Sequence, residues 1–404
     1  MDEKMTLGNV NVLDVRNTPK ETFDKLKLIG NVNVILVSPE TASYLPGIPA
    51  KNINAVAHVP ADVGVKTCMS SITLNAHYLE GLPARTFLLV MGRILVESDV
   101  TVEMIDTHLA GLVVMGKVVC PDAVLGALQA KTSLMMGTAV PYPADAVLIS
   151  SSLKLDDAFL NGLPDGTKLV VTGSLRVIDD VSNERIEKKI QSLTAVGSVL
   201  CRQEHAMTLK AKLERPGDMV VIPAQHRLIE GILSLDELSI QSLDGARLFC
   251  LSDVLISNDV EATLLERALT RIESLGVIVC PAKLKDVLKS TCDMLGNRVI
   301  LYEHNLWYVD NDRQLLPEQF DYVEGAMTIV NRGDLEITED VSAQMLMEKI
   351  DKIHNLGDIT CGADQISAIE ARLGIRDGDI NARKPSEPDV EAQPTVGNAN
   401  MLVL

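Results

Sequence analysis

Apolar residues alternate with small or polar residues around a glycine in LLVMGRILV, residues 88–96. The pattern predicts a strand, a kink at Gly92 and a second strand, because successive strand side chains point to opposite faces. The segment SNERIEKKIQSL, residues 182–193, instead places Ile186, Ile190 and Leu193 at intervals of four and three, with charges elsewhere. That spacing predicts an amphipathic helix. Because patterns of both kinds alternate along the chain, we expect an α/β fold.

A fixed series of landmarks recurs along the chain. Within residues 88–121 a glycine, an Asp-Val pair, a second glycine and a cysteine follow one another, and most of the series returns three more times at intervals of 79 to 81 residues. A doubly wound α/β sheet would not repeat its landmarks in this way. The recurrence predicts a right-handed β/α solenoid built from internal repeats of about 80 residues. The columns are Asp99, Asp180, Asp259 and Asp340, and Cys120, Cys201, Cys280 and Cys361.

The landmarks also divide the chain into segments. Residues 18–40 align with residues 100–122 at an offset of 82, so the first segment is a diverged copy of the repeat. The last segment is rich in Pro, Glu, Asn and Ala, which is typical of a disordered tail, and it ends in the apolar tip MLVL. We expect a first repeat and N-terminal cap at 1–86, repeats at 87–167, 168–247 and 248–327, a partial repeat and C-terminal cap at 328–378, and a disordered tail at 379–404.

Short parallel strands joined by helical returns, as predicted for residues 6–378, resemble at the level of architecture the leucine-rich-repeat proteins and their irregular bacterial relatives. The resemblance implies a solenoid fold. The LxxLxLxxN core of that family is absent from this sequence, and each unit is several turns long rather than one. The resemblance therefore assigns no functional residue.

The repeated columns have structural interpretations. The aspartates precede predicted helices, with Ser or Thr two residues later in three copies, so we interpret them as helix N-caps. The glycines mark kinks or tight turns, and Gly374 is expected to end the last helix. The cysteines are interpreted as small buried residues that close a strand before a helix. Seven cysteines without a CxxC pair predict neither a disulfide framework nor a metal site.

Charge and motifs narrow the possible functions. The formal charge of −18 repels phosphate backbones, so we expect no nucleic-acid binding. The N-terminal MDEKMTLGN lacks the pattern of a secretory signal, and no apolar run is long enough for a membrane span, so we expect a cytoplasmic protein. No phosphate-binding loop, GxSxG or HExxH motif is present, which predicts no cofactor and no enzymatic activity.

Two stretches break the repeat and are the candidate sites. Residues 301–322 contain the only tryptophan, and their aromatic residues either fill the joint to the terminal copy or form a partner-binding patch. The apolar tip is either a frayed end or a short peptide that docks on a partner or a neighbouring copy. The candidate residues are Tyr302, His304, Trp307, Tyr308, Phe320 and Tyr322 in the first stretch, and Met401, Leu402, Val403 and Leu404 in the second.

The sequence thus favours a non-enzymatic repeat scaffold that presents an extended surface to a protein partner. One alternative is a self-assembling structural protein, a homo-oligomer that forms filaments or lattices through its open solenoid ends. Another is an enzyme with an unrecognised site near Trp307.

Overall fold

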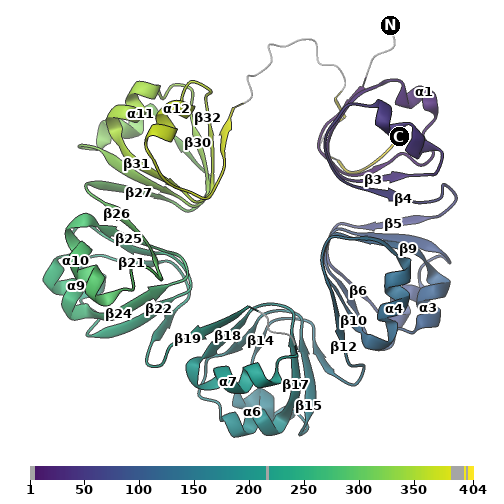
Figure 1. Cartoon of the computed structure of the whole chain (residues 1–404), viewed down its shortest axis with the longest axis horizontal. Coiled ribbons are helices and arrows are strands. Elements are labelled where there is room, and N and C mark those ends of the chain that lie inside the picture. The colour runs from purple at the N-terminus through teal and green to yellow at the C-terminus, as the bar shows by residue number, and fades with distance from the viewer. Residues whose placement is uncertain (1–4, 215–217, 384–394, 397–398) are drawn as a thin grey trace. The chain divides into compact units, whose positions relative to one another are not determined.

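The computed structural model describes residues 5–214, 218–383, 395–396 and 399–404. It is an α/β structure in which parallel strands form several sheets joined by short helices (Figure 1). The chain divides into two compact parts, residues 1–221 with 389–404 and residues 222–388. No helix of the described residues is long and apolar enough to cross a membrane.

The basic element is a pair of strands joined by a corner and followed by a helix. Strand β7 (Thr86–Val90) leads through Gly92 into β8 (Ile94–Val96) and then into helix α3 (Val102–His108). We call such a strand pair with its helix a rung. In the next rung β9 (Leu109–Val114) pairs with β7, and β10 (Val118–Pro121) pairs with β8, both in parallel. Stacked rungs therefore build two parallel sheets, which fits a β/α repeat architecture.

Up to four rungs stack into what we call a module, and the described residues form five modules. Three belong to the N-terminal part, where α6 and α7 lie side by side against the sheet of the third module (Figure 1). The first module comprises β1 (Met5–Leu7), β2 (Val10–Asp14), α1 (Lys20–Phe23), β3 (Leu26–Val37), η1 (Thr41–Ser43), η2 (Leu45–Gly47), β4 (Ala50–His58), β35 (Thr395–Val396) and β36 (Ala399–Val403). The second adds β5 (Val65–Cys68), β6 (Ile72–Leu74) and α2 (Ala76–Glu80) before β7, and α4 (Asp122–Lys131), β11 (Thr132–Met135) and β12 (Ala139–Tyr142) after β10. The third comprises β13 (Val147–Ile149), β14 (Leu153–Lys154), α5 (Asp157–Gly162), β15 (Thr167–Val171), β16 (Leu175–Val177), α6 (Asn183–Lys189), β17 (Ile190–Ala195), β18 (Val199–Arg202), α7 (Gln203–Lys212) and β19 (Met219–Ile222).

The C-terminal part contains the fourth and fifth modules. The fourth comprises β20 (Arg227–Ile229), β21 (Leu233–Leu235), α8 (Glu237–Ile240), β22 (Ala246–Cys250), β23 (Val254–Ile256), α9 (Ala262–Ala268), β24 (Leu269–Ser274), β25 (Val277–Pro281), η3 (Ala282–Leu284), α10 (Lys285–Thr291) and β26 (Arg298–Tyr302). The fifth comprises β27 (Asn305–Val309), β28 (Arg313–Leu315), η4 (Pro317–Tyr322), β29 (Met327–Asn331), β30 (Asp334–Ile337), α11 (Ala343–Lys349), β31 (Ile350–Asn355), β32 (Asp358–Cys361), α12 (Ile366–Ala371), β33 (Leu373–Arg376) and β34 (Ile380–Ala382).

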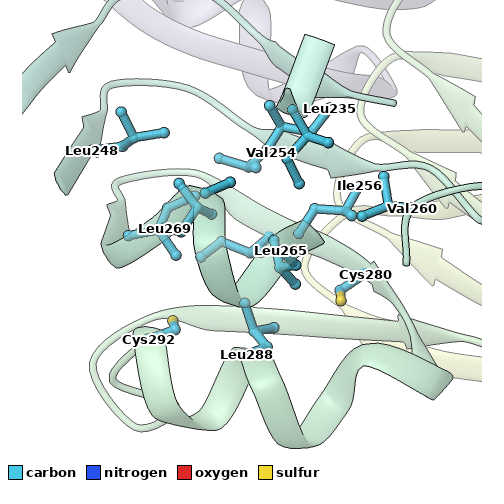
Figure 2. Close-up of a cluster of buried hydrophobic side chains, with 14 of the residues drawn as sticks. Leu235, Leu248, Val254, Ile256, Val260, Leu265, Leu269, Cys280, Leu288 and Cys292 are labelled. Carbon is cyan, nitrogen blue, oxygen red and sulfur yellow. The ribbon is translucent and has the colours of Figure 1, made fainter. Parts of the chain in front are cut away.

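Each module encloses its own aliphatic core. In the fourth module Val254 and Ile256 from β23 meet Leu265 from α9 and Leu288 from α10 (Figure 2). All four side chains are fully buried. Burial of each such side chain stabilises the fold by roughly 1.5–3 kcal/mol, so a module without large aromatic residues still has a substantial core.

The helices are shorter than the sequence pattern predicts. The helix expected over 182–193 ends at Lys189, and Ile190 and Leu193 lie in β17. In the pairing of β15 with β17 the register shifts between Ile190 and Ser192, so one residue is bulged. The bulge turns Ile190 and Leu193 to the same buried face despite a spacing of three. A helix and a bulged strand give the same apolar pattern here, which is why the sequence did not separate them.

The corner glycines are required by space rather than by an unusual backbone angle. A Cβ on Gly116 would lie 2.7 Å from the carbonyl oxygen of Gly92 in the rung before it. A Cβ on Gly197 would lie 2.6 Å from the carbonyl oxygen of Gly173. The corners of successive rungs therefore stack backbone against backbone, and a side chain at these positions would separate them.

Two predicted caps need correction. The N-caps of α3 and α11 are Thr101 and Ser342, two residues beyond the aspartate column, and their hydroxyls accept bonds from backbone N–H groups. Asp99 instead accepts a bond from the backbone N–H of Ala76 at the start of α2, 3.1 Å away, and so joins neighbouring rungs. Gly374 lies in β33 rather than at a helix end, where its lack of a side chain makes room for the buried ring of His354.

Adjacent modules in each part pack through the outward faces of their sheets. In the N-terminal part Val34 of the first module lies in one buried cluster with Phe87 and Leu89 of the second. In the C-terminal part Val279 of the fourth module clusters with Val330 of the fifth. Sheets that face another module therefore carry apolar residues on both sides, as expected for buried parallel sheets.

We predict that Gly116→Ala lowers the free energy of unfolding by about 1–3 kcal/mol, because the new methyl group meets the backbone of the preceding rung. The matched control is Gly126→Ala, at a position in α4 with no atom near the new Cβ. That substitution should stabilise the helix by about 0.5–1 kcal/mol. Urea unfolding of both variants checks the prediction, and equal midpoints would contradict it.

Candidate functional site

The aromatic stretch does not form one patch. Trp307 and Phe320 pack in the core of the fifth module, whereas Tyr302 and Tyr308 lie in the cluster between the fourth and fifth modules. His304 is exposed, and Tyr322 is 89% exposed. The structure therefore brings the six residues together only in pairs, and the four largest contacts are with aliphatic core residues.

Tyr302 has a structural counterpart in the second module. Its buried hydroxyl donates a hydrogen bond to the carbonyl oxygen of Ile256, 2.8 Å away. Tyr142 donates in the same manner to the carbonyl oxygen of Val96, 2.6 Å away, and burial raises the pKa of Tyr142 to about 12. Both phenols bind the free end of a strand in the same module. Tyr302 thus acts as a recurring internal fastening.

Tyr308 helps to join the fourth and fifth modules. Its hydroxyl donates to Asp253 Oδ2 at 2.6 Å, and burial, followed by this bond to a carboxylate, raises the pKa of Tyr308. Asp253 is 1% exposed, pairs with Arg332 at 3.0 Å and accepts a bond from the backbone N–H of Val277. A buried carboxylate with three partners is well satisfied, so this cluster has a positioning role.

The cysteine column is buried and its thiols stay protonated. Burial is the main cause that raises the pKa of Cys120 and Cys280 to about 12 and that of Cys201 to about 11. His205, near Cys201 in sequence, is also buried and contacts Asn183 and the backbone oxygen of Asp179. Within the described ranges no three His, Cys, Asp or Glu residues form a group that could hold a metal ion.

The apolar tip, in contrast, occupies a defined position. Residues 384–394 and 397–398 lie outside the described residues, but Ala399–Val403 form strand β36, which pairs in parallel with β2 (Figure 1). The sequence analysis treats 379–404 as disordered, and the structure instead places β34, β35 and β36 there. The composition was a poor guide because five consecutive residues with a suitable partner are enough to extend a parallel sheet.

Side chains of β36 divide between the core and the surface. Leu402 and Leu404 pack against the core cluster of the first module, whereas Met401 is 38% and Val403 is 64% exposed. The backbone N–H of Leu404 donates to the carbonyl oxygen of Asp14, and Thr18 Oγ1 donates to the carbonyl oxygen of Leu404 at 2.8 Å. The tip is therefore held by a ladder, by two core leucines and by a bond to its last residue.

An asparagine ladder aligns the tip with the first module. Each asparagine donates its amide N–H to the amide oxygen of the asparagine on the rung before it, at distances of 2.7 to 3.0 Å. The last acceptor of the series is on β36. Because the direction is the same at each step, the tail strand continues the pattern of the three strands beside it. The ladder runs from Asn54 through Asn33 and Asn11 to Asn400.

The tail takes the place of a rung that the first module does not supply. The second module begins with β5 and β6, and β7 and β8 follow. In the first module β1 and β2 correspond to β7 and β8, because the next strand, β3, aligns with β9 and β10. Strands β35 and β36 pair with β1 and β2 where β5 and β6 would lie. Chemically, this edge is a site for an extended peptide.

A short motif could have revealed this site from the sequence. The tail reads VGNANMLVL, and two segments of the first module read LGNVNVLDV and IGNVNVILV, at residues 7–15 and 29–37. In each segment two asparagines flank one small or apolar residue and four further residues follow. The search for repeats near 80 residues missed this because the three copies lie 22 and 389 residues apart from the first.

Comparisons with protein-family models, with curated proteins and with solved structures give no match to this chain. Its chemistry must therefore be inferred from its own residues.

For the aromatic stretch we predict that Tyr302→Phe lowers the free energy of unfolding by about 1–3 kcal/mol, because the carbonyl of Ile256 loses its buried donor. Tyr322→Phe, at an exposed position, should change it by less than about 0.5 kcal/mol. Urea unfolding of both variants provides the measurement. If Tyr302→Phe left stability unchanged, the internal role of this tyrosine would be wrong.

For the tail we predict that Leu402→Asp releases β36, because a carboxylate replaces a side chain packed on the core. Val403→Asp is the matched control, since its side chain is largely exposed. Hydrogen exchange of the β2 amides should accelerate in the first variant and stay near the wild-type rate in the second. Similar exchange in both variants would argue against docking of the tip.

Proposed function

We propose that the protein is a non-enzymatic repeat scaffold, located in the cytoplasm, that presents an extended surface to a protein partner. In this proposal the chain is a right-handed β/α solenoid of about 80-residue repeats that resembles leucine-rich-repeat proteins. The observation that carries the proposal is the polar outward face of the fifth module.

That face differs from the corresponding faces of other modules. In the second module the paired row is Leu95, Val119 and Val140, and all three are buried against the third module. In the fifth module the equivalent row is polar. A polar row does not favour the burial of another module, so it leaves the face available to a soluble partner. The row consists of Gln314, Glu336, Thr360 and Asn381.

The polar row lines a depression of about 700 Å³. Glu336 lies within it, accepts a bond from Gln314 at 2.7 Å and pairs with Arg383 at 2.8 Å. These partners hold the pKa of the Glu336 carboxyl below its ordinary value, with the bond from Gln314 as the main cause. The face thus combines fixed charges with hydrogen-bonding groups, which suits a polar protein surface better than an apolar ligand.

Two alternatives from the sequence are less well supported. Self-assembly by stacking of solenoid ends would bury the polar row of the fifth module, which is costly without matching partners. An enzyme with a site near Trp307 would need reactive groups beside that ring, but Trp307 packs among aliphatic residues of the fifth module. Filaments or lattices in negative-stain images of the purified protein would nevertheless favour the first alternative.

The proposal can be tested by site-specific photo-crosslinking in the native cell. A photoreactive amino acid at Thr360 should give a discrete adduct with a partner protein, and Glu336→Arg should weaken that adduct several-fold by reversing a charge. The same reactive group at Leu295, which is 99% exposed away from the polar row, serves as the control. An identical adduct pattern from both positions, or none from Thr360, would sink the proposal.

A further inference from the structure

The first module is incomplete within its own stretch of chain. Strands β1 and β2 would form an open edge without β35 and β36, which are separated from them by more than 380 residues of sequence. An open edge of this kind exposes a row of unpaired backbone N–H and C=O groups and binds an added strand. The site and its ligand are thus both present in every copy of the chain.

We propose that this edge is a strand-acceptor site that takes residues 396–404 of a second copy as well as its own, so that the protein forms strand-exchanged homo-oligomers. This goes beyond the proposed scaffold function, because it concerns the first module and not the polar face of the fifth. In the exchanged state the tail strand of one copy makes the same ladder with β2 of the other.

The contacts define which strand fits the edge. The strand must carry an amide side chain opposite Asn11, whose N–H donates to Asn400 Oδ1 at 3.0 Å. It must also carry apolar residues at the positions of Leu402 and Leu404, which pack on the core. The only segments of the chain with the GNxN motif are 7–15, 29–37 and 396–404, and the first two are already inner strands of the module. The ligand that the sequence supplies is therefore the tail of another copy.

The covalent link allows this exchange. Only residues 384–394 separate the last strand of the fifth module, with its following Arg383, from β35. Eleven residues span at most about 40 Å, so the link sets a limit on closure within one chain but none on closure between chains. Closure between chains becomes competitive when the protein concentration approaches the effective concentration of a tethered strand, which is in the millimolar range.

A charge-swap experiment on the full-length chain tests the proposal. One variant carries Asn11→Asp and Asn400→Asp, and the other carries Asn11→Lys and Asn400→Lys. Each variant places like charges opposite each other when its own tail docks, whereas exchange between the two variants pairs opposite charges. The two proteins are unfolded in urea, mixed and refolded together at about 0.5 mM, and the oligomers are resolved by native mass spectrometry.

The expected result is a hetero-oligomer at least about tenfold more abundant than the homo-oligomer of either variant refolded alone. Adding Leu402→Asp to both variants should abolish it, since the exchanged strand then loses its core contact. Monomers alone in the mixed sample would overturn the proposal, because they would show that the tail docks only in its own chain. A hetero-oligomer that survives Leu402→Asp would overturn it equally, because another contact would then be the link.

Discussion

The close approach of backbones at the corners between strand pairs is the constraint on which the rest of the structure depends. Gly116 and Gly197 stack on the glycine of the preceding rung with no room for a Cβ. Because each corner is fixed in this way, the strands on both sides run in register with those of the next rung. Two sheets and a row of helices then follow from one repeated contact, and the small aliphatic residues fill the space that they enclose.

The outward faces of the sheets decide what each module can contact. Leu95 and Val119 face a further module and are buried, whereas Glu336 and Thr360 occupy the same row in the fifth module and are polar. The change needs only a few substitutions in one strand row. A repeat fold of this kind can therefore separate two roles, because internal faces join modules and a terminal face can bind another molecule.

Much of the fold could be predicted from the sequence, because it depends on local patterns. The alternation around Gly92 gave the paired strands, and the cysteine column gave buried positions. The helix ends could not be predicted, since the bulge at Ile190 makes a strand look helical. The docked tail also escaped prediction, because pairing over 389 residues leaves no local signal except the motif shared by Asn11 and Asn400. The roles of Tyr302 and Tyr308 became clear only from their partners in space.

The position of β36 also has a consequence for the birth of the protein. Strand β2 is among the first segments to leave the ribosome, and the strand that pairs with it is the last. At about 5–20 residues per second, roughly 20–80 s of synthesis separate the two. The first module to be made is thus the last to be finished, and a chain that ends early leaves it permanently short of one edge. Completion of this module marks the chain as full length.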